Sequence, residues 1–203
     1  MAFLEQQSGS KASFWAVVAL LGLLNGCAAS RVSLEPTLDP LTGVTFGRSA
    51  KPVVFYRDNS GQAAYARDYV YLGPIWVNRV GDYQYYLWLG LWSTHGGSID
   101  DTQRRDEFAR VTIIADGEPL SLEVAGWTPS DIGTSTDVYA KPVASAVDAY
   151  YPVTLDQIRF LSEASDIRID AVAGGNDSYT LWDGANNGGR SLRRFVQRVM
   201  FPE

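Results

Sequence analysis

Apolar runs of strand length, separated by polar turn sequences, occupy the chain from Pro52 to about Val153 and predict antiparallel β structure. The expected strands are residues 53–56, 69–80, 83–94, 111–115, 120–124 and 147–153. Gly81-Asp82 separates the two longest strands and is a two-residue hairpin signal, because tight hairpin turns need positive φ. The sequence 116–119, Asp-Gly-Glu-Pro, predicts a second hairpin.

The last third of the chain adds helical periodicity. Thr154 followed by Gln157 is a capping box, which predicts a helix that ends near Ser165. Two further strands are expected at residues 167–173 and 179–182. A final helix is expected from about Ser191, with apolar residues spaced at one helical face: Leu192, Phe195, Val196 and Val199. The expected fold class is therefore α+β, mainly an antiparallel sheet or sandwich with two short C-terminal helices.

An eleven-residue apolar run, Phe14 to Leu24, lies directly before the only cysteine of the chain, Cys27. The run is too short to span a membrane, which needs about 20 residues, and it has the length of a signal-peptide core. The sequence Leu24-Asn25-Gly26-Cys27 resembles the lipobox of bacterial lipoproteins. Two other interpretations are a conventional secretory signal and an uncleaved anchor, in which Cys27 is merely a small apolar residue.

The resemblance to lipoproteins implies cleavage before Cys27 and three acyl chains on that residue. Two or more chains hold a protein on a membrane in an effectively permanent way. Because Ala28 and Ala29 follow the cysteine, and not Asp, the resemblance implies the periplasmic face of the bacterial outer membrane. The membrane, reached through the lipid on Cys27, is thus the first expected partner.

We expect three segments in the chain. Residues 1–26 are the signal peptide, residues 27–51 are the lipidated N-terminus and tether, and residues 52–203 are one globular periplasmic domain. The tether is inferred from Pro36, Pro40 and a turn sequence, without sustained periodicity. An alternative is that residues 44–46 add an edge strand to the domain.

The charge and cysteine content limit the partners of the domain. Removal of Lys11 and Glu5 with the signal peptide leaves the net charge at −6. Such a surface gives no support for binding nucleic acid through a general basic field. Without a second cysteine the mature domain has no intrachain disulfide, and no cofactor is indicated by any motif.

The only histidine, His95, lies in a His-Gly-Gly sequence that is comparable to the oxyanion loop of esterases. The Gly-x-Ser-x-Gly nucleophile sequence of those enzymes is absent, so a loop histidine is the preferred interpretation and a catalytic base the alternative. A metal site would have to combine His95 with Asp100, Asp101 or Asp106, and no metal is expected. A glycine-rich group lacks the spacing of a calcium loop and is better explained as turns: Asp177, Asp183, Asn186 and Asn187.

The segment from Tyr83 to Trp92 is rich in Tyr and Trp. In a strand, Tyr86, Trp88 and Trp92 would share one face, and the opposite face would also be apolar. The preferred interpretation is a central strand that is buried on both sides. The functional alternative is a platform of these three residues for glycan rings or a partner protein, which Tyr69, Tyr71 and Trp76 would extend.

The final helix has an arginine face, formed by Arg190, Arg193, Arg194 and Arg198. Solvation of these charges is the preferred interpretation, and contact with lipid phosphates or acidic glycan is the alternative. The layout resembles that of small envelope lipoproteins of unassigned function. We expect a lipid-anchored, non-enzymatic protein that binds another envelope component or supports envelope assembly. An envelope hydrolase with a site around His95 and a glycan-binding module are the alternatives.

Overall fold

The computed structural model describes residues 36–59, 65–94, 101–171, 178–182 and 188–201. The chain divides into two units, Met1–Ser33 and Leu34–Glu203, and every described residue belongs to the second unit. None of the helices in the described ranges is long and apolar enough to cross a membrane.

The described part of this unit is an α+β fold, as predicted. Its strands are β1 (Thr37–Leu38), β2 (Thr45–Arg48), β3 (Val53–Asp58), β4 (Arg67–Arg79), β5 (Asp82–Ser93), β6 (Arg110–Ala115), β7 (Glu118–Glu123), β8 (Val147–Val153), β9 (Ile167–Ala171) and β10 (Tyr179–Leu181). Its helices are α2 (Asp101–Glu107), the 3-10 helix η2 (Pro129–Ile132), α3 (Leu155–Glu163) and α4 (Gly188–Met200). The two C-terminal helices were predicted, whereas α2 and η2 were not.

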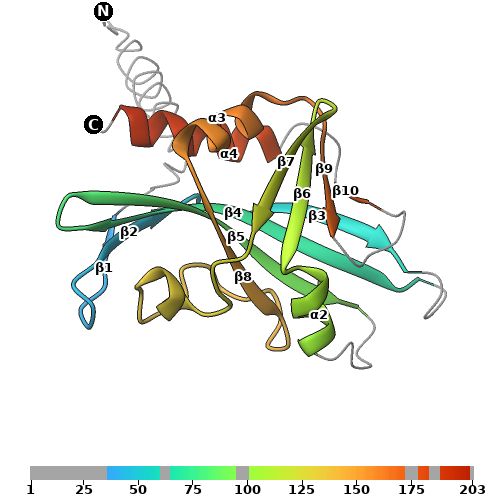
Figure 1. Cartoon of the computed structure of the whole chain (residues 1–203), viewed down its shortest axis with the longest axis horizontal. Helices are drawn as coiled ribbons and strands as arrows, with labels where there is room; N and C mark the ends of the chain where they lie inside the picture. Colours follow the sequence, from blue (N-terminus) through green and yellow to red (C-terminus); the bar gives the residue numbers. More distant parts are fainter. Residues whose placement is uncertain (1–35, 60–64, 95–100, 172–177, 183–187, 202–203) are drawn as a thin grey trace, which may run out of the picture. The chain divides into compact units, whose positions relative to one another are not determined.

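The strands form one open antiparallel sheet with β4 at its centre (Figure 1). Along one edge β4 pairs with β5, and along the other it pairs with β3 through its first half and with β2 through its second half. The sheet continues from β3 through β10, β9, β6 and β7, and from β5 to β8. Consecutive strands are often neighbours, and the two predicted hairpins correspond to the pairs β4–β5 and β6–β7.

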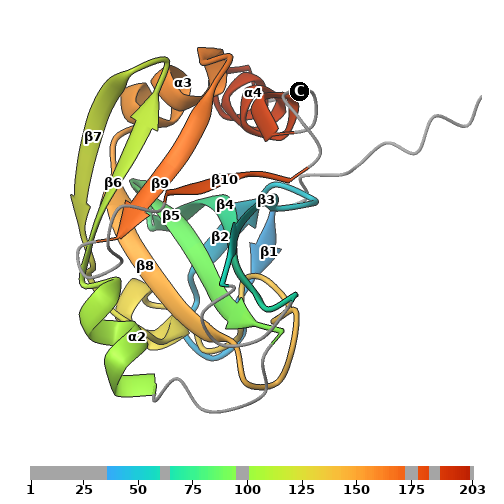
Figure 2. The same cartoon turned by 90° about the vertical axis from the view of Figure 1, so that its right-hand side faces the viewer.

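The sheet curls so far that its two ends approach one another (Figure 2). Directly after β7, the amide of Ala125 donates to the carbonyl of Tyr150 on β8 at 2.7 Å, and the amide of Tyr150 donates to the carbonyl of Gly126 at 2.9 Å. Helices α3 and α4 lie side by side and cover one side of the curled sheet, while α2 lies at the opposite end of the unit (Figures 1 and 2).

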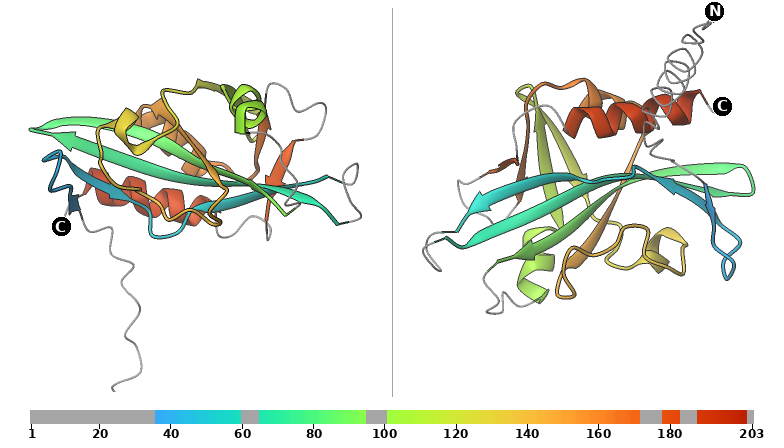
Figure 3. Two further views of the ribbon diagram at one scale, coloured as in Figure 1. Left: turned by 90° about the horizontal axis from the view of Figure 1, so that it is seen from below. Right: turned by 180° about the vertical axis from the view of Figure 1, so that it is seen from behind.

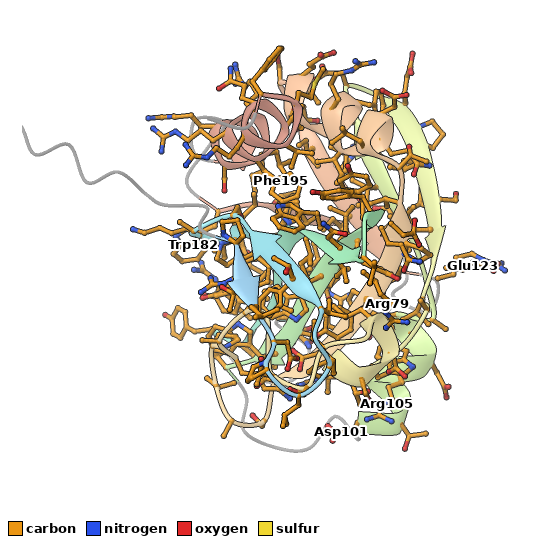
Figure 4. The ribbon with its side chains drawn as sticks, turned by 90° about the vertical axis from the view of Figure 1, so that its left-hand side faces the viewer. Arg79, Asp101, Arg105, Glu123, Trp182 and Phe195 are labelled. Atoms are coloured by element: carbon orange, nitrogen blue, oxygen red, sulfur yellow. The ribbon has the colours of Figure 1, made fainter. Side chains whose placement is uncertain are left out.

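The larger hydrophobic core lies on the inner face of the sheet, which we define as the face that packs against α3 and α4. Leu72 and Leu89 of the central strands are at most 1% exposed, and Phe195 of α4 is completely buried. Every second residue of β4 and β5 points inward, and the residues between them point to the other face of the sheet. Phe195 projects from α4 toward the sheet (Figure 4).

A second core covers part of the outer face, because both faces of the central strands are apolar. It contains Ile75 and Trp88 from the sheet, and a chain segment with Ile132 and Tyr139 lies over them. The Tyr139 hydroxyl donates to the carbonyl of Pro74 at 2.9 Å. The Tyr139 ring lies so close to Gly73 that a Cβ there would fall 2.3 Å from it, so this residue has to be glycine.

The structure corrects the predicted extent of the tether, because residues 36–51 belong to the folded domain. Strand β2 pairs with β4, and Phe46 is 5% exposed within the second core. The carboxylate of Asp39 accepts hydrogen bonds from the amide and the hydroxyl of Ser135, which hold its pKa well below the usual range. The alternative of an added strand at residues 44–46 is thus confirmed by β2, although β2 is not the edge strand, because β1 pairs with its other side.

The predicted hairpins are present, with small shifts of the turns. Both turns contain two residues with positive φ, namely Val80-Gly81 and Asp116-Gly117. The first turn therefore lies one residue earlier than Gly81-Asp82. The second is shorter than the predicted sequence 116–119, because β7 already begins at Glu118.

Val80 occupies a strained position that offers a stabilising substitution. Its φ is 53°, which a β-branched side chain rarely adopts, and it is fully exposed. We expect Val80→Asn to raise the free energy of unfolding by about 1 kcal/mol, since Asn-Gly is favoured in this type of turn. Thermal unfolding measures the change, and Val80→Ala is the control for loss of the branched side chain alone. An unchanged or lower melting temperature of Val80→Asn contradicts the assigned turn.

The C-terminal helices follow their local sequence signals. The Thr154 hydroxyl accepts from the amide of Gln157 at 3.1 Å, and the Gln157 side chain accepts from the amide of Thr154 at 2.8 Å. This capping box starts α3 as predicted. Helix α4 begins at Gly188, three residues before the predicted start at Ser191, and buries Leu192 on its predicted face.

Candidate functional site

Aromatic side chains gather on the outer face where β3, β4 and β5 lie side by side. The strand register places Tyr56 opposite Tyr69, and Tyr69 opposite Trp92. The rings of Tyr69 and Trp92 stack with their centroids 4.5 Å apart and an interplanar angle of 13°. Trp182, directly after β10, meets the Tyr56 ring edge-on at 5.3 Å. With Tyr71, which meets Trp92 at 6.1 Å, these residues form what we call the aromatic surface.

The aromatic surface is partly open to solvent. Trp182 is 41% exposed, and the other four members are half-buried. Figure 4 shows Trp182 at the outer boundary of the unit. The guanidinium of Arg67 lies 5.1 Å from the centre of the Tyr56 ring and 5.3 Å from that of Trp182, and it forms an ion pair with Asp58 at 2.8 Å. The surface therefore combines large apolar rings with a charged hydrogen-bonding group, a composition typical of protein interfaces.

Arg57 of β3 and Asp68 of β4 point inward and form a buried ion cluster with Glu107 of α2. Arg57 binds Asp68 at 3.0 Å and Glu107 at 3.3 Å, and the three side chains are 13%, 6% and 11% exposed. Asn59 donates to the same Asp68 oxygen at 2.9 Å, and the guanidinium of Arg57 lies 4.5 Å from the centre of the Tyr179 ring. Burial raises the pKa of Glu107, and the nearby charge of Arg57 opposes this rise.

A small hollow adjoins the ion cluster beneath α2. Its volume is about 240 Å³, part of which is open solvent, and it is lined by Asp68, Tyr69, Leu91, Trp92, Arg104, Glu107, Phe108 and Tyr179. Because much of that volume is open to solvent, the enclosed space is only about that of a single water molecule. Within the part of the chain that the structure describes, the second carboxylate oxygen of Asp68 has no hydrogen-bond partner, and it can accept a hydrogen bond from such a molecule.

The structure places two of the three predicted platform residues in the core. Tyr86 is 9% exposed and Trp88 is 1% exposed, both beneath the segment that carries Tyr139. The proposed platform of Tyr86, Trp88 and Trp92 is therefore wrong as an exposed surface, because the outer face of β5 is covered at Tyr86 and Trp88. The preferred interpretation, a strand buried on both sides, is confirmed for this part of β5. Trp92 lies beyond the cover and belongs to the aromatic surface.

Several other predicted positions lie outside the described residues. They are Cys27, His95, Asp100, Asp177, Asp183, Asn186 and Asn187. Asp101 and Asp106 are described and lie exposed on α2. Among the described residues, no group of three His, Cys, Asp or Glu side chains is arranged to hold a metal ion.

Sequence reasoning missed Tyr56 and Trp182. The sequence pattern identified Tyr69, Tyr71 and Trp76 as neighbours of the Tyr/Trp-rich strand. The first two belong to the aromatic surface, whereas Trp76 packs against the inner core and was wrongly included. Tyr56 and Trp182 come from β3 and from the end of β10, and only the pairing of β3 with both β4 and β10 brings them into the same surface. The pairing of β3 with β4, which places Tyr56 opposite Tyr69, is the one signal that could have indicated Tyr56.

No protein-family model matches the chain, and neither a curated protein nor a solved structure shows significant similarity to it.

Proposed function

We propose that this chain is a lipid-anchored protein of the bacterial envelope that binds another envelope protein through the aromatic surface, without catalysing a reaction. The aromatic surface is the observation that carries the proposal. Tyr, Trp and Arg are the residues most enriched at the energetic centres of protein interfaces, and Trp182, Tyr56 and Arg67 lie together at its exposed side.

The anchor in this proposal is Cys27, supported by the apolar run before it and by the lipobox-like sequence around it. The chain from Cys27 to Pro36 spans at most about 30 Å, since an extended residue covers 3.3–3.6 Å. Such a short connection keeps the domain near the membrane that holds the lipid. The partner of the aromatic surface is therefore expected at the same membrane or in the adjacent periplasm.

The binding half of the proposal is tested by crosslinking in intact cells. A photoreactive amino acid replaces Thr180, which is exposed and lies beside Tyr56 in the register, so that the aromatic rings stay intact. We expect one discrete adduct that is sensitive to protease, lost with Trp182→Ala and retained with Tyr83→Ala. Tyr83 is a matched control, because it is 52% exposed at the other end of β5. An adduct that persists with Trp182→Ala contradicts the proposal, and one that only a glycosidase removes favours a glycan ligand.

The anchor is tested in the same cells by metabolic labelling with a fatty acid. We expect the label on the unsubstituted chain and on Ser30→Ala, and none on Cys27→Ala, because acylation begins at the cysteine thiol. Persistent labelling of Cys27→Ala would show that the lipobox interpretation is wrong. The two measurements are independent, so failure of the anchor leaves the test of the aromatic surface intact.

A further inference from the structure

Helix α4 presents two chemically different sides. Leu192, Phe195 and Val196 pack into the inner core and are at most 6% exposed. The solvent side carries four arginines that are all exposed, namely Arg190, Arg193, Arg194 and Arg198. Arg190, Arg194 and Arg198 follow at intervals of four residues, so they lie one above the other along the helix. We call these four residues the arginine face.

The arginine face is a local exception in an acidic chain. Net charge is −6 over the whole sequence, yet α4 contains no Asp or Glu. Arg190 and Arg198 also make contacts within the protein, and Nε of Arg193 donates to the carbonyl of Gly189 at 3.2 Å. A guanidinium has five N–H donors in a planar fork, so it retains donors for a bidentate contact with a phosphate group.

Exposed apolar side chains follow the arginine face at the end of the helix. Met200 is 44% exposed and Phe201 is 70% exposed. Basic residues along one side of an amphipathic helix, next to exposed Phe and Met, are features of helices that lie in a membrane interface. Figure 3 shows α4 along the outside of the unit, and Figures 1 and 2 show α2 on the opposite side.

We propose that the arginine face and Phe201 form a docking surface for the anionic phosphate headgroups of a lipid bilayer. The arginines bind the phosphates, and Phe201 enters the boundary between headgroups and acyl chains. This orientation directs α2 away from the bilayer. The proposal stands independently of lipidation, because it requires only that the domain reaches a bilayer surface.

Energy transfer from a dye on the protein to labelled headgroups tests this orientation. The full chain with Cys27→Ser carries one introduced cysteine for the dye, either Gln197→Cys on α4 or Gln103→Cys on α2, both exposed positions. It is mixed with vesicles of phosphatidylcholine, with or without phosphatidylglycerol. We expect strong energy transfer from the dye at position 197 and weak transfer from the dye at position 103. The difference between the two positions should require phosphatidylglycerol and should decrease as the salt concentration increases.

Substitutions of the four arginines distinguish the effect of their charge on docking from an effect on folding. Each surface arginine contributes about 1 kcal/mol to binding at an anionic membrane, or roughly fivefold in the docked-to-undocked ratio. Replacing all four arginines by Gln is therefore expected to lower this ratio by nearly three orders of magnitude, or roughly 600-fold, whereas replacing all four by Lys preserves most of it. The matched control is Arg105→Gln with Arg110→Gln, at exposed arginines on and beside α2. Melting temperatures confirm that each variant is folded.

Three outcomes would overturn the proposal. The first is equal transfer from positions 197 and 103. The second is unchanged transfer in the Gln variant while it remains folded, which would show that the arginines do not bind the headgroups. The third is binding of a soluble acidic glycan through the arginine face without docking on anionic vesicles, which would assign the face to a glycan.

Discussion

Trp88→Ala is expected to lower the free energy of unfolding by about 3–5 kcal/mol, the range found when a buried large aromatic is removed. Trp88 is 1% exposed and stacks on Tyr139 with the ring centroids 4.7 Å apart. Its indole N–H donates to Asp148 at 3.0 Å, and burial already raises the pKa of that carboxyl. The substitution therefore opens a cavity and also leaves Asp148 with one hydrogen-bond donor fewer.

Chemical denaturation measures this effect, with Trp182→Ala as the matched control. Trp182 is 41% exposed, so its removal is expected to cost about 1 kcal/mol or less. Trp88→Phe should fall between the two, because it keeps the ring packing and loses the hydrogen bond. Equal destabilisation by Trp88→Ala and Trp182→Ala is the result that contradicts the burial of Trp88.

Arg57→Gln is expected to destabilise the protein by about 3–5 kcal/mol at neutral pH, because it leaves Asp68 and Glu107 buried without their cation. The effect depends on pH in a defined direction. Burial raises the pKa of Glu107 in the folded protein, so the folded state binds this proton more tightly than the unfolded state does. Loss of the arginine charge raises that pKa further, since Arg57 opposes the rise.

The destabilisation by Arg57→Gln should therefore be largest at neutral pH and decrease as pH falls through the raised pKa of Glu107. Denaturation curves of both proteins between neutral pH and a pH of about 5 measure this difference. Glu107→Gln removes the titrating group, so the double variant should be less destabilised than the sum of the two single variants. A difference that stays constant with pH contradicts the assigned role of Glu107.

The local elements of this fold could be predicted because their signals lie within a few residues. Asp116-Gly117 determines a two-residue turn, and Thr154 with Gln157 determines the start of α3. The one-residue shift at Val80-Gly81 has a local reason as well, since Asn78 accepts a hydrogen bond from the amide of Gly81 at 2.7 Å and closes the turn. The helix α2 gave no such signal, because its seven residues contain no apolar periodicity.

The candidate site could be predicted only in part. Tyr69 and Trp92 share one hairpin, which the sequence indicated, but a hairpin register follows from its turn, and the predicted turn at Gly81-Asp82 would place Trp92 opposite Tyr71 and not Tyr69. Trp182 follows β10 and Glu107 lies in α2, far in sequence from the residues that they contact, and contacts over such distances leave no local signature. The segment that covers Tyr86 and Trp88 had no predicted structure at all, so the sequence left open whether β5 was buried.

By itself the sequence determined the α+β class, most strands, the two C-terminal helices and the arginine face of α4, because hydrophobic periodicity and turn chemistry are local properties of the chain. It also supplied the basis for the proposed anchor at Cys27. Only the tertiary structure decided that Trp88 is a core residue, that Trp182 joins Tyr56 on the surface, and that Arg57 lies between two carboxylates. The physical reason is that burial and charge pairing depend on which distant segments meet, and β4 meets three other strands along its two edges.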